Sequence, residues 1–319
     1  MKPHCCKEKD IKKQAFVSTL EEILVSGNDA YRNEFCYKNK RGVIPYRLYR
    51  YTPIGDNSVD NLISSRLCLN NPRSFNDPFD CWYRKRIKPC FSARSIAILQ
   101  SRLFSLFGVN MTEDEFKADD SLQKMADKLP VDKRNGFLAI VEQSVNQVAN
   151  HTSNYMNRFL DEHVRVVCLT EYSPAQLLMW SHYGDYHKGM CLEYDFLDCD
   201  EDTYAMLMPV IYTEEIPSIN HDAIDNDSHC ESYALKLVLF KSKEWEYEKE
   251  WRLIKCFDNP SRKKIFHHVP FLKHIYIGVC ADEHDEYVKN VINFARGKCI
   301  PISKMQRKDD SYLLYKKSI

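Results

Sequence analysis

The sequence predicts an α+β protein with a mixed, mostly antiparallel sheet, flanking helices and a helical insertion. Strand-length apolar runs such as HVRVVCLT (163–170) are mixed with helical patterns, without the strict strand–helix alternation of a parallel α/β fold. No period of about 20–50 residues recurs, which argues against a solenoid. We therefore expect a single α+β domain over residues 1–319.

The first 160 residues are expected to be mainly helical. Phe16, Leu20 and Leu24 stand at helical spacing, which predicts an amphipathic helix. The segment NNPRSFNDPFD (70–80) combines prolines, asparagines and aspartates and is typical of turns. The elements predicted in order are a helix over 10–33 within an N-terminal helical extension (1–40), a strand over 46–51, a helix over 58–66, a strand near 67–70, and a helical insertion over 92–160 with breaks near 110–112 and at Pro130.

Strand patterns dominate from residue 163 onward. Pro174 suits the first turn of a short helix, because proline lacks the N–H that would be unpaired there. A polar loop is expected over 214–230, and helices over 231–241 and 284–296. The strands predicted are 163–170, 189–195, 206–213, 250–255, 274–279, 299–304 and 312–315.

Composition excludes several classes of function. Lys+Arg and Asp+Glu are balanced at 45 each, so net charge gives no reason to expect a general polyanion binder. Only 9 glycines are present, and neither a Rossmann fingerprint nor a P-loop occurs. The motifs C-x-x-C, H-E-x-x-H and G-x-S-x-G are also absent.

The N-terminal segment lacks the apolar core of a secretory signal, and no run reaches the roughly 20 apolar residues of a membrane span. The 13 cysteines are odd in number and scattered, and several fall in apolar strand patterns. They are typical of reduced thiols that pack as small hydrophobic side chains. These features predict a cytoplasmic protein without membrane contact.

The run EWEYEKEWR (244–252) carries the most informative pattern. If the whole run were extended, alternate side chains would share a face, which would hold Glu244, Glu246, Glu248, Glu250 and Arg252. The first residues can belong to the preceding helix or loop, so the alternation is expected only from about residue 247. Adjacent carboxylates repel unless a cation or a raised pKa relieves them, as often occurs at functional sites. A solvated strand face with a Glu250–Arg252 pair is the alternative.

Two earlier motifs offer ligand-binding side chains. LYRY (48–51) places Arg50 next to Tyr51, with Arg47 just before, and arginine binds phosphate or carboxylate through two parallel hydrogen bonds. The alternative is an amphipathic strand whose arginines extend to solvent. In FNDPFD (75–80), Asn76 and Asp77 favour a rigid turn that could line a ligand cleft.

The segment 169–195 supplies a third group of candidates. Thr170 is expected at a strand end, and Trp180, His182 and Tyr183 follow close together, with His187 beyond them. The two histidines have an unsuitable spacing for zinc and no third ligand nearby, so no metal is expected. They could bind ligand at the rim of a cleft. Alternatively, they could be partly buried, with their ring nitrogens hydrogen-bonded within the fold.

These motifs in this order resemble a bacterial family known as domain of unknown function 2971. The resemblance rests on LYRY, FNDPFD, MWSHYGDYHKG and WEYEKEWR and extends over about residues 46–255. The arrangement also resembles, more distantly, the ADP-ribosyltransferase fold. That resemblance implies Arg50 on an early strand, Thr170 or Tyr183 on a middle strand, and Glu248-x-Glu250 on a late one. The S-T-S triplet of that fold is absent, and Arg47 competes with Arg50.

The resemblance implies chemistry on NAD, as an ADP-ribosyltransferase or NAD glycohydrolase with protein, nucleic acid or water as acceptor. Glu250 would stabilise the positive charge that develops on the ribose, and Glu248 would orient or deprotonate the acceptor. Arg50 would bind the pyrophosphate, Tyr51 or Tyr183 would stack against nicotinamide, and Arg252 would hold Glu250. In bacteria such activities often serve as toxins or antiphage effectors.

Two other functions remain open at this point. A nuclease dependent on a divalent metal would use Asp77, Glu248 and Glu250 around the cation. A non-catalytic binding or sensor module would use the row of acids to recognise a basic partner.

Overall fold

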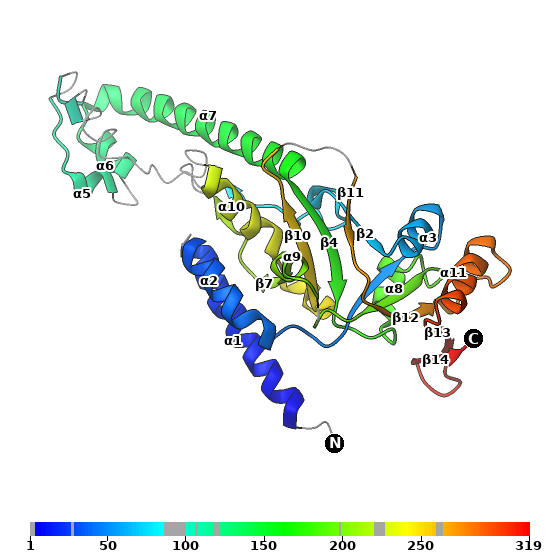
Figure 1. The fold of residues 1–319 in the computed structure, drawn as a ribbon. Helices are drawn as coiled ribbons and strands as arrows, with labels where there is room; N and C mark the ends of the chain where they lie inside the picture. The colour runs from blue at the N-terminus through cyan, green and yellow to red at the C-terminus, as the bar shows by residue number, and fades with distance from the viewer. Residues whose placement is uncertain are drawn as a thin grey trace.

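The computed structural model describes residues 4–319 except 27–28, 86–99, 102, 106–107, 118–120, 198, 220–226 and 260–263. Its largest sheet among these residues has eight strands in the order β14-β13-β12-β5-β1-β4-β10-β6 (Figure 1). All neighbours in this sheet are antiparallel except β12 and β13. The predicted α+β class with a mixed, mostly antiparallel sheet is confirmed. The strands are β1 (Leu48–Thr52), β4 (Val164–Thr170), β5 (Met190–Tyr194), β6 (Leu207–Pro209), β10 (Glu250–Cys256), β12 (Leu272–Ile277), β13 (Ile302–Arg307) and β14 (Leu314–Ser318).

Strands β4 and β10 make the longest ladder of the described sheet. They pair over seven residues, from Glu250↔Thr170 to Cys256↔Val164. Their apolar side chains, including Val167, Leu169, Trp251 and Leu253, are almost completely buried, so the continuous apolar runs seen in the sequence lie in the core. This pairing fixes the position of both ends of β10 relative to β4.

Strands β1 and β4 separate soon after they meet. Pairing between them is limited to Tyr49↔Thr170, whereas β1 pairs with β5 along its whole length, from Leu48↔Tyr194 to Thr52↔Met190. From Arg50 onward in β1, and before Thr170 in β4, the two strands therefore leave part of each edge without a ladder partner. This split in the sheet positions the candidate site.

Helices pack on the sheet and extend from it. A large apolar cluster joins α1, α3, α10 and α11 to the sheet, and a smaller one lies under α8. Figure 1 shows α7 projecting away from the sheet, with α5 and α6 near its far end. The helices are α1 (His4–Ser26), α2 (Asp29–Asn39), α3 (Asp56–Ile63), α5 (Glu113–Lys117), α6 (Ser121–Asp127), α7 (Val131–His163), α8 (Leu177–Tyr183), α9 (Glu201–Met206), α10 (Asp227–Leu239) and α11 (Glu286–Gly297).

Short strands and 3-10 turns complete the fold. They are β2 (Arg66–Leu69) paired with β11 (Ile265–His268), β3 (Arg84–Lys85) paired with β8 (Ser218–Ile219), β7 (Ile211–Thr213) paired with β9 (Phe240–Ser242), and the 3-10 helices η1 (Lys40–Gly42), η2 (Pro72–Ser74) and η4 (Lys243–Glu248). In the described part of the chain, no helix has both the length and the apolar character needed to cross a membrane.

Several sequence predictions of elements were wrong in detail. The helix expected over 10–33 is two helices, α1 and α2, which fold back on each other so that the rings of Phe16 and Phe35 stack with centroids 5.0 Å apart. The strand expected over 206–213 is divided at Val210 into β6 and β7, which belong to different sheets. Pro174 precedes the helix, which begins at Leu177, and its carbonyl accepts a hydrogen bond from the indole of Trp180 at 2.8 Å. The short strands β8 and β11 and the helix α9 were not predicted.

The helical insertion expected over 92–160 agrees with the described part of the chain. The break near 110–112 lies in the extended segment before α5, and Pro130 is the N-cap residue of α7. Residues 92–99 lie outside the described residues. Helix α7 continues to His163 and leads directly into β4.

Replacing Gly278 with alanine should lower stability. A Cβ atom there would lie 2.1 Å from the carbonyl oxygen of His187, because the segment after β12 packs directly on the loop before β5. We expect Gly278→Ala to reduce the free energy of unfolding by about 1–3 kcal/mol in urea titrations. Gly297→Ala is the matched control, because a Cβ at Gly297 meets nothing within 4 Å. Equal stability of the two variants would contradict this packing.

Candidate functional site

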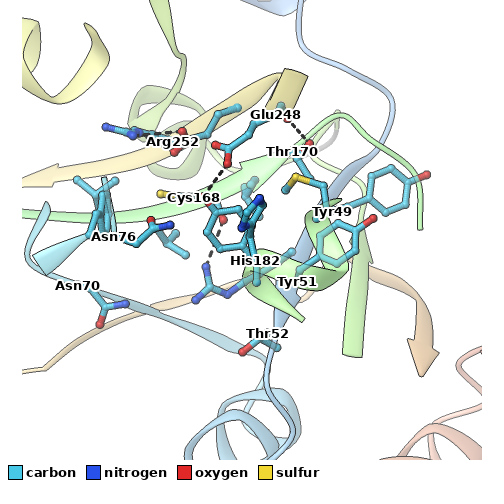
Figure 2. A pocket seen from close by; sticks show the side chains of 18 of the residues that line it. Tyr49, Tyr51, Thr52, Asn70, Asn76, Cys168, Thr170, His182, Glu248 and Arg252 are labelled. Atoms are coloured by element: carbon cyan, nitrogen blue, oxygen red, sulfur yellow. Dashed lines mark hydrogen bonds and ion pairs between the residues drawn. The ribbon is translucent and has the colours of Figure 1, made fainter. Parts of the chain in front are cut away.

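A pocket of about 540 Å³ lies where β1 and β4 separate. Its walls come from both strands, from α8, from the 75–80 turn and from the start of β10. The volume falls within the range of ordinary small-molecule sites, about 300–1,000 Å³. Figure 2 shows Glu248 and Arg252 on one side of this pocket and Thr52 and Asn70 on the opposite side.

A buried charge network forms the inner wall of the pocket. Lys241 Nζ lies 2.7 Å from Glu248 Oε2 and 3.0 Å from Glu250 Oε2. Arg252 holds Glu250 through two hydrogen bonds, from Nε at 2.7 Å and from Nη2 at 3.1 Å, and Nη2 also lies 2.9 Å from Asp80 Oδ1. These five side chains are all at most 4% exposed. The predicted Glu250–Arg252 pair is present, but in the interior rather than on a solvated strand face.

Burial and charge move the pKa values of the two glutamates in opposite directions. Burial alone would raise the pKa of Glu250, but Arg252 and Lys241 outweigh it and lower that pKa to about 2. Burial raises the pKa of Glu248 above its ordinary value, and the neighbouring charge of Glu250 adds to this effect while Lys241 opposes it. Glu250 is therefore a permanent anion, whereas Glu248 gains and loses its proton more readily.

The backbone around Glu248 differs from the predicted strand. Residues 243–248 form η4, and Lys249 adopts a left-handed conformation with φ of 45° before β10 begins at Glu250. The hydroxyl of Thr170 donates to the carbonyl of Glu248, and the N–H of Glu250 donates to the hydroxyl of Tyr212 at 2.8 Å. The alternation expected from about residue 247 begins at Glu250, where the strand starts. Glu244 and Glu246, which precede that alternation, are exposed on η4.

The two candidate arginines have different environments. Arg47 pairs with Glu193 at 2.9 Å and with Asp195, and it does not line the pocket. Arg50 is half-buried in the pocket wall, and its Nη1 donates to the carbonyl of Cys168 at 3.2 Å. Among the residues that the structure describes, Arg50 has no carboxylate partner. It is therefore the arginine available to an anionic ligand.

Most of the sequence-predicted site residues come together around the pocket. Tyr183 donates its hydroxyl hydrogen to Glu248 Oε1 at 2.6 Å. Tyr51 is largely buried, with its hydroxyl donating to the carbonyl of Ser173 and its ring meeting that of Trp180 edge-on. The predicted residues that line the pocket are Arg50, Tyr51, Asn76, Thr170, His182, Tyr183, Glu248, Glu250 and Arg252.

Three predicted residues lie outside the pocket lining. Trp180 is fully buried in the cluster under α8. The Nε2 atom of His187 lies 3.1 Å from the hydroxyl of Ser181, and its ring stacks on Trp180. Asp77 Oδ1 accepts a hydrogen bond from the N–H of Phe79 at 2.9 Å, which is the turn geometry that the sequence indicates.

Sequence reasoning did not assign roles to Lys241 and Asp80. Lys241 follows the apolar run LVLF, and a lysine in that position signals a buried cation that needs carboxylate partners. Asp80 closes the FNDPFD motif, 172 positions before its partner Arg252. In the described part of the chain, no group of three or more His, Cys, Asp or Glu side chains is placed to hold a metal ion.

Removing the cation between the two glutamates should strongly destabilise the fold. Lys241→Met leaves Glu248 and Glu250 buried next to each other without their shared partner, so we expect a loss of about 3–5 kcal/mol in the free energy of unfolding. Urea titration followed by tryptophan fluorescence measures this, since Trp180 and Trp251 are fully buried. Lys243→Met, which removes an exposed pair with Glu214, should cost far less. Similar losses in both variants would contradict the network.

The acid dependence of stability should report on Glu250. Its pKa falls from an ordinary value of 4.5 to about 2 on folding, so the unfolded chain binds more protons between these pH values. The stability that Glu250 contributes is fully present above pH 4.5 and is lost as the pH falls toward 2. Glu248, whose pKa is raised, contributes stability that is present below pH 4.5 and is lost as the pH rises above that value. Unfolding free energies at pH 3 and pH 5 should differ less in Glu250→Gln than in the parent protein. An unchanged difference would show that Glu250 does not carry this effect.

Comparison with known proteins identifies one family. No curated protein and no solved structure gives a match to the chain. One family model matches residues 179–253 of the chain. This segment contains most of α8 together with Lys241, Glu248, Glu250 and Arg252. It therefore covers the charge network except Asp80, and it excludes Arg50 and the 75–80 turn. Residues 179–253 match the family model described as "Protein of unknown function (DUF2971)", which confirms the family that the sequence motifs indicate.

Proposed function

We propose that the protein binds NAD in the pocket between β1 and β4 and breaks the bond between nicotinamide and ribose. The ADP-ribose would pass to a protein, a nucleic acid or water, and in a bacterium such an activity would serve as a toxin or antiphage effector. The observation that carries this proposal is the pair Glu248 and Glu250, whose pKa values are moved in opposite directions within one pocket that also contains Arg50.

The inner wall suits a reaction that develops positive charge. When all are ionised, the carboxylates of Asp80, Glu248 and Glu250 outnumber the cations of Lys241 and Arg252. Departure of nicotinamide leaves positive charge on the ribose ring, and a fixed anion in a buried wall stabilises that charge strongly. Glu250 keeps its charge over the physiological range, because its pKa is about 2.

Glu248 has the properties of a general base toward the acceptor. Its pKa is raised, which makes its carboxylate a stronger base than that of an ordinary glutamate, and it lines the pocket. Lys241 holds Oε2 and Tyr183 holds Oε1, so the carboxylate is oriented before substrate arrives. Tyr183, which is half-buried at the pocket, is better placed than the largely buried Tyr51 to stack against nicotinamide.

Arg50 would bind the pyrophosphate. An arginine without a carboxylate partner in the described residues, placed in the wall of a pocket, offers two parallel hydrogen bonds to a phosphate. Thr170 acts through the backbone, because its hydroxyl is bonded to the carbonyl of Glu248 and accepts from the N–H of Tyr172. Its role is to position the end of η4.

The observed contacts favour this proposal over the other two functions. In a metal-dependent nuclease, Asp77 would have to join Glu248 and Glu250, but Asp77 does not line the pocket. The ammonium of Lys241 occupies the position between the glutamates that a divalent cation would take. A surface row of acids for a basic partner is not formed either, because Glu248 and Glu250 are buried.

Release of nicotinamide from NAD tests the proposal. Purified protein should release nicotinamide, and Glu248→Gln should lower the rate about 10²–10⁴-fold, because the amide keeps the shape of the side chain but cannot accept a proton. Glu246→Gln is the matched control, since Glu246 is exposed on the same 3-10 helix, and its rate should be unchanged. The proposal is wrong if no nicotinamide appears with water, protein or nucleic acid as acceptor, or if the two variants behave alike.

A further inference from the structure

We infer that the ligand extends past Arg50 into a second cavity, which holds the adenosine half of a dinucleotide. This inference rests on the proposed function and assigns it a substrate class and a second subsite. The second cavity has a volume of about 270 Å³ and lies among β1, α3, β2 and β11. It is slightly smaller than ordinary ligand sites, which begin at about 300 Å³, so it fits part of a larger ligand.

The two cavities share one wall. Arg50, Thr52 and Asn70 line both of them. Figure 2 shows Thr52 and Asn70 on the side of the first pocket that lies opposite Glu248 and Arg252. A ligand that begins at the glutamates and continues across the first pocket therefore reaches this wall, where the guanidinium of Arg50 can contact its centre.

The charges change sign along this path. The first pocket ends in a wall with three carboxylates and two cations, which suits a cationic group. The shared wall carries Arg50, and the second cavity adds Lys264 and Arg66, of which Arg66 pairs with Asp60 in the same lining. A ligand with a positive ring at one end and phosphates at its centre matches this order. NAD has that order, with the nicotinamide ring, then the pyrophosphate, then adenosine.

The second cavity also has groups that suit a purine. The guanidinium of Arg66 lies over the ring of Phe266 at 4.0 Å, and this ring is 40% exposed. A flat guanidinium–aromatic stack of this kind offers a surface on which a base can stack. The side-chain amides of Asn57 and Asn61 line the same cavity. Their oxygens accept hydrogen bonds from Lys264 and Arg66, and their N–H groups can donate to the edge of the base or to the ribose hydroxyls.

Calorimetric titration with ADP-ribose, ADP and nicotinamide mononucleotide tests the inference. Titrations with nicotinamide mononucleotide use proteins that also carry Glu248→Gln, because this ligand contains the nicotinamide–ribose bond. ADP and ADP-ribose should bind, and Arg66→Ala should weaken both about tenfold while leaving nicotinamide mononucleotide unaffected. Arg50→Ala should weaken all three about tenfold to a hundredfold, because each ligand carries phosphate at the shared wall. The inference is overturned if neither ADP nor ADP-ribose binds, or if Arg66→Ala does not weaken them.

Two variants control for loss of a surface arginine. Arg73→Ala breaks a pair with Asp161 at 2.6 Å, the same length as the Arg66–Asp60 pair, and Arg73 lines neither cavity. Arg47→Ala is the control for Arg50→Ala, since Arg47 directly precedes β1 and lines neither cavity. The inference would be overturned if Arg66→Ala and Arg50→Ala weakened ligand binding no more than these two controls do.

The outcomes also separate this subsite from the proposed chemistry. If ADP binding depends on Arg66 but no nicotinamide is released from NAD, the proposed chemistry alone is rejected. If nicotinamide is released but Arg66→Ala leaves ADP binding unchanged, this subsite alone is rejected.

Discussion

Two buried cations and three buried carboxylates at the start of β10 constrain the rest of this structure. An ion removed from water loses several kcal/mol of solvation, so each of these groups needs partners with close geometry. Lys241 comes from β9, Arg252 from β10 and Asp80 from the 75–80 turn, and each is held at 3.0 Å or less from a carboxylate or guanidinium partner. Because no member can be satisfied without the others, the network joins segments that are far apart in the sequence.

The pairing of the strands explains where the pocket lies. Strand β10 is fixed to β4 by seven paired residues, and β1 is fixed to β5, but β1 and β4 share only Tyr49↔Thr170. The edge of β4 that β1 leaves is partly satisfied by side chains and turns: Arg50 donates to the carbonyl of Cys168, and Asn70 exchanges two backbone hydrogen bonds with Val166. A polar pocket can therefore exist inside a sheet without leaving these carbonyls unpaired.

The sequence predicts those features that depend on local pattern. The apolar runs locate β4 and β10, and the FNDPFD motif indicates the turn at Asp77. The spacing of Glu250 and Arg252 on one strand face predicts their pair. Features that depend on distant partners could not be predicted in this way. Nothing near Lys241 or Asp80 shows which charges they meet, and the left-handed conformation of Lys249 is set by the contacts around it rather than by its own propensity.

The same contacts assign different chemistry to the two glutamates. Both oxygens of Glu250 accept hydrogen bonds from buried cations, so this carboxylate has no free position for a proton, and its charge is fixed. Glu248 has one oxygen on Lys241 and the other on the hydroxyl of Tyr183, which is a neutral group that a substrate hydroxyl could replace. A proton taken from an acceptor would therefore go to Glu248, while Glu250 supplies constant negative charge nearby. In the proposed reaction these roles would be separate without any movement of the backbone. Lys241 contacts both acids, whereas the carboxylates that Arg252 contacts among the described residues are those of Glu250 and Asp80.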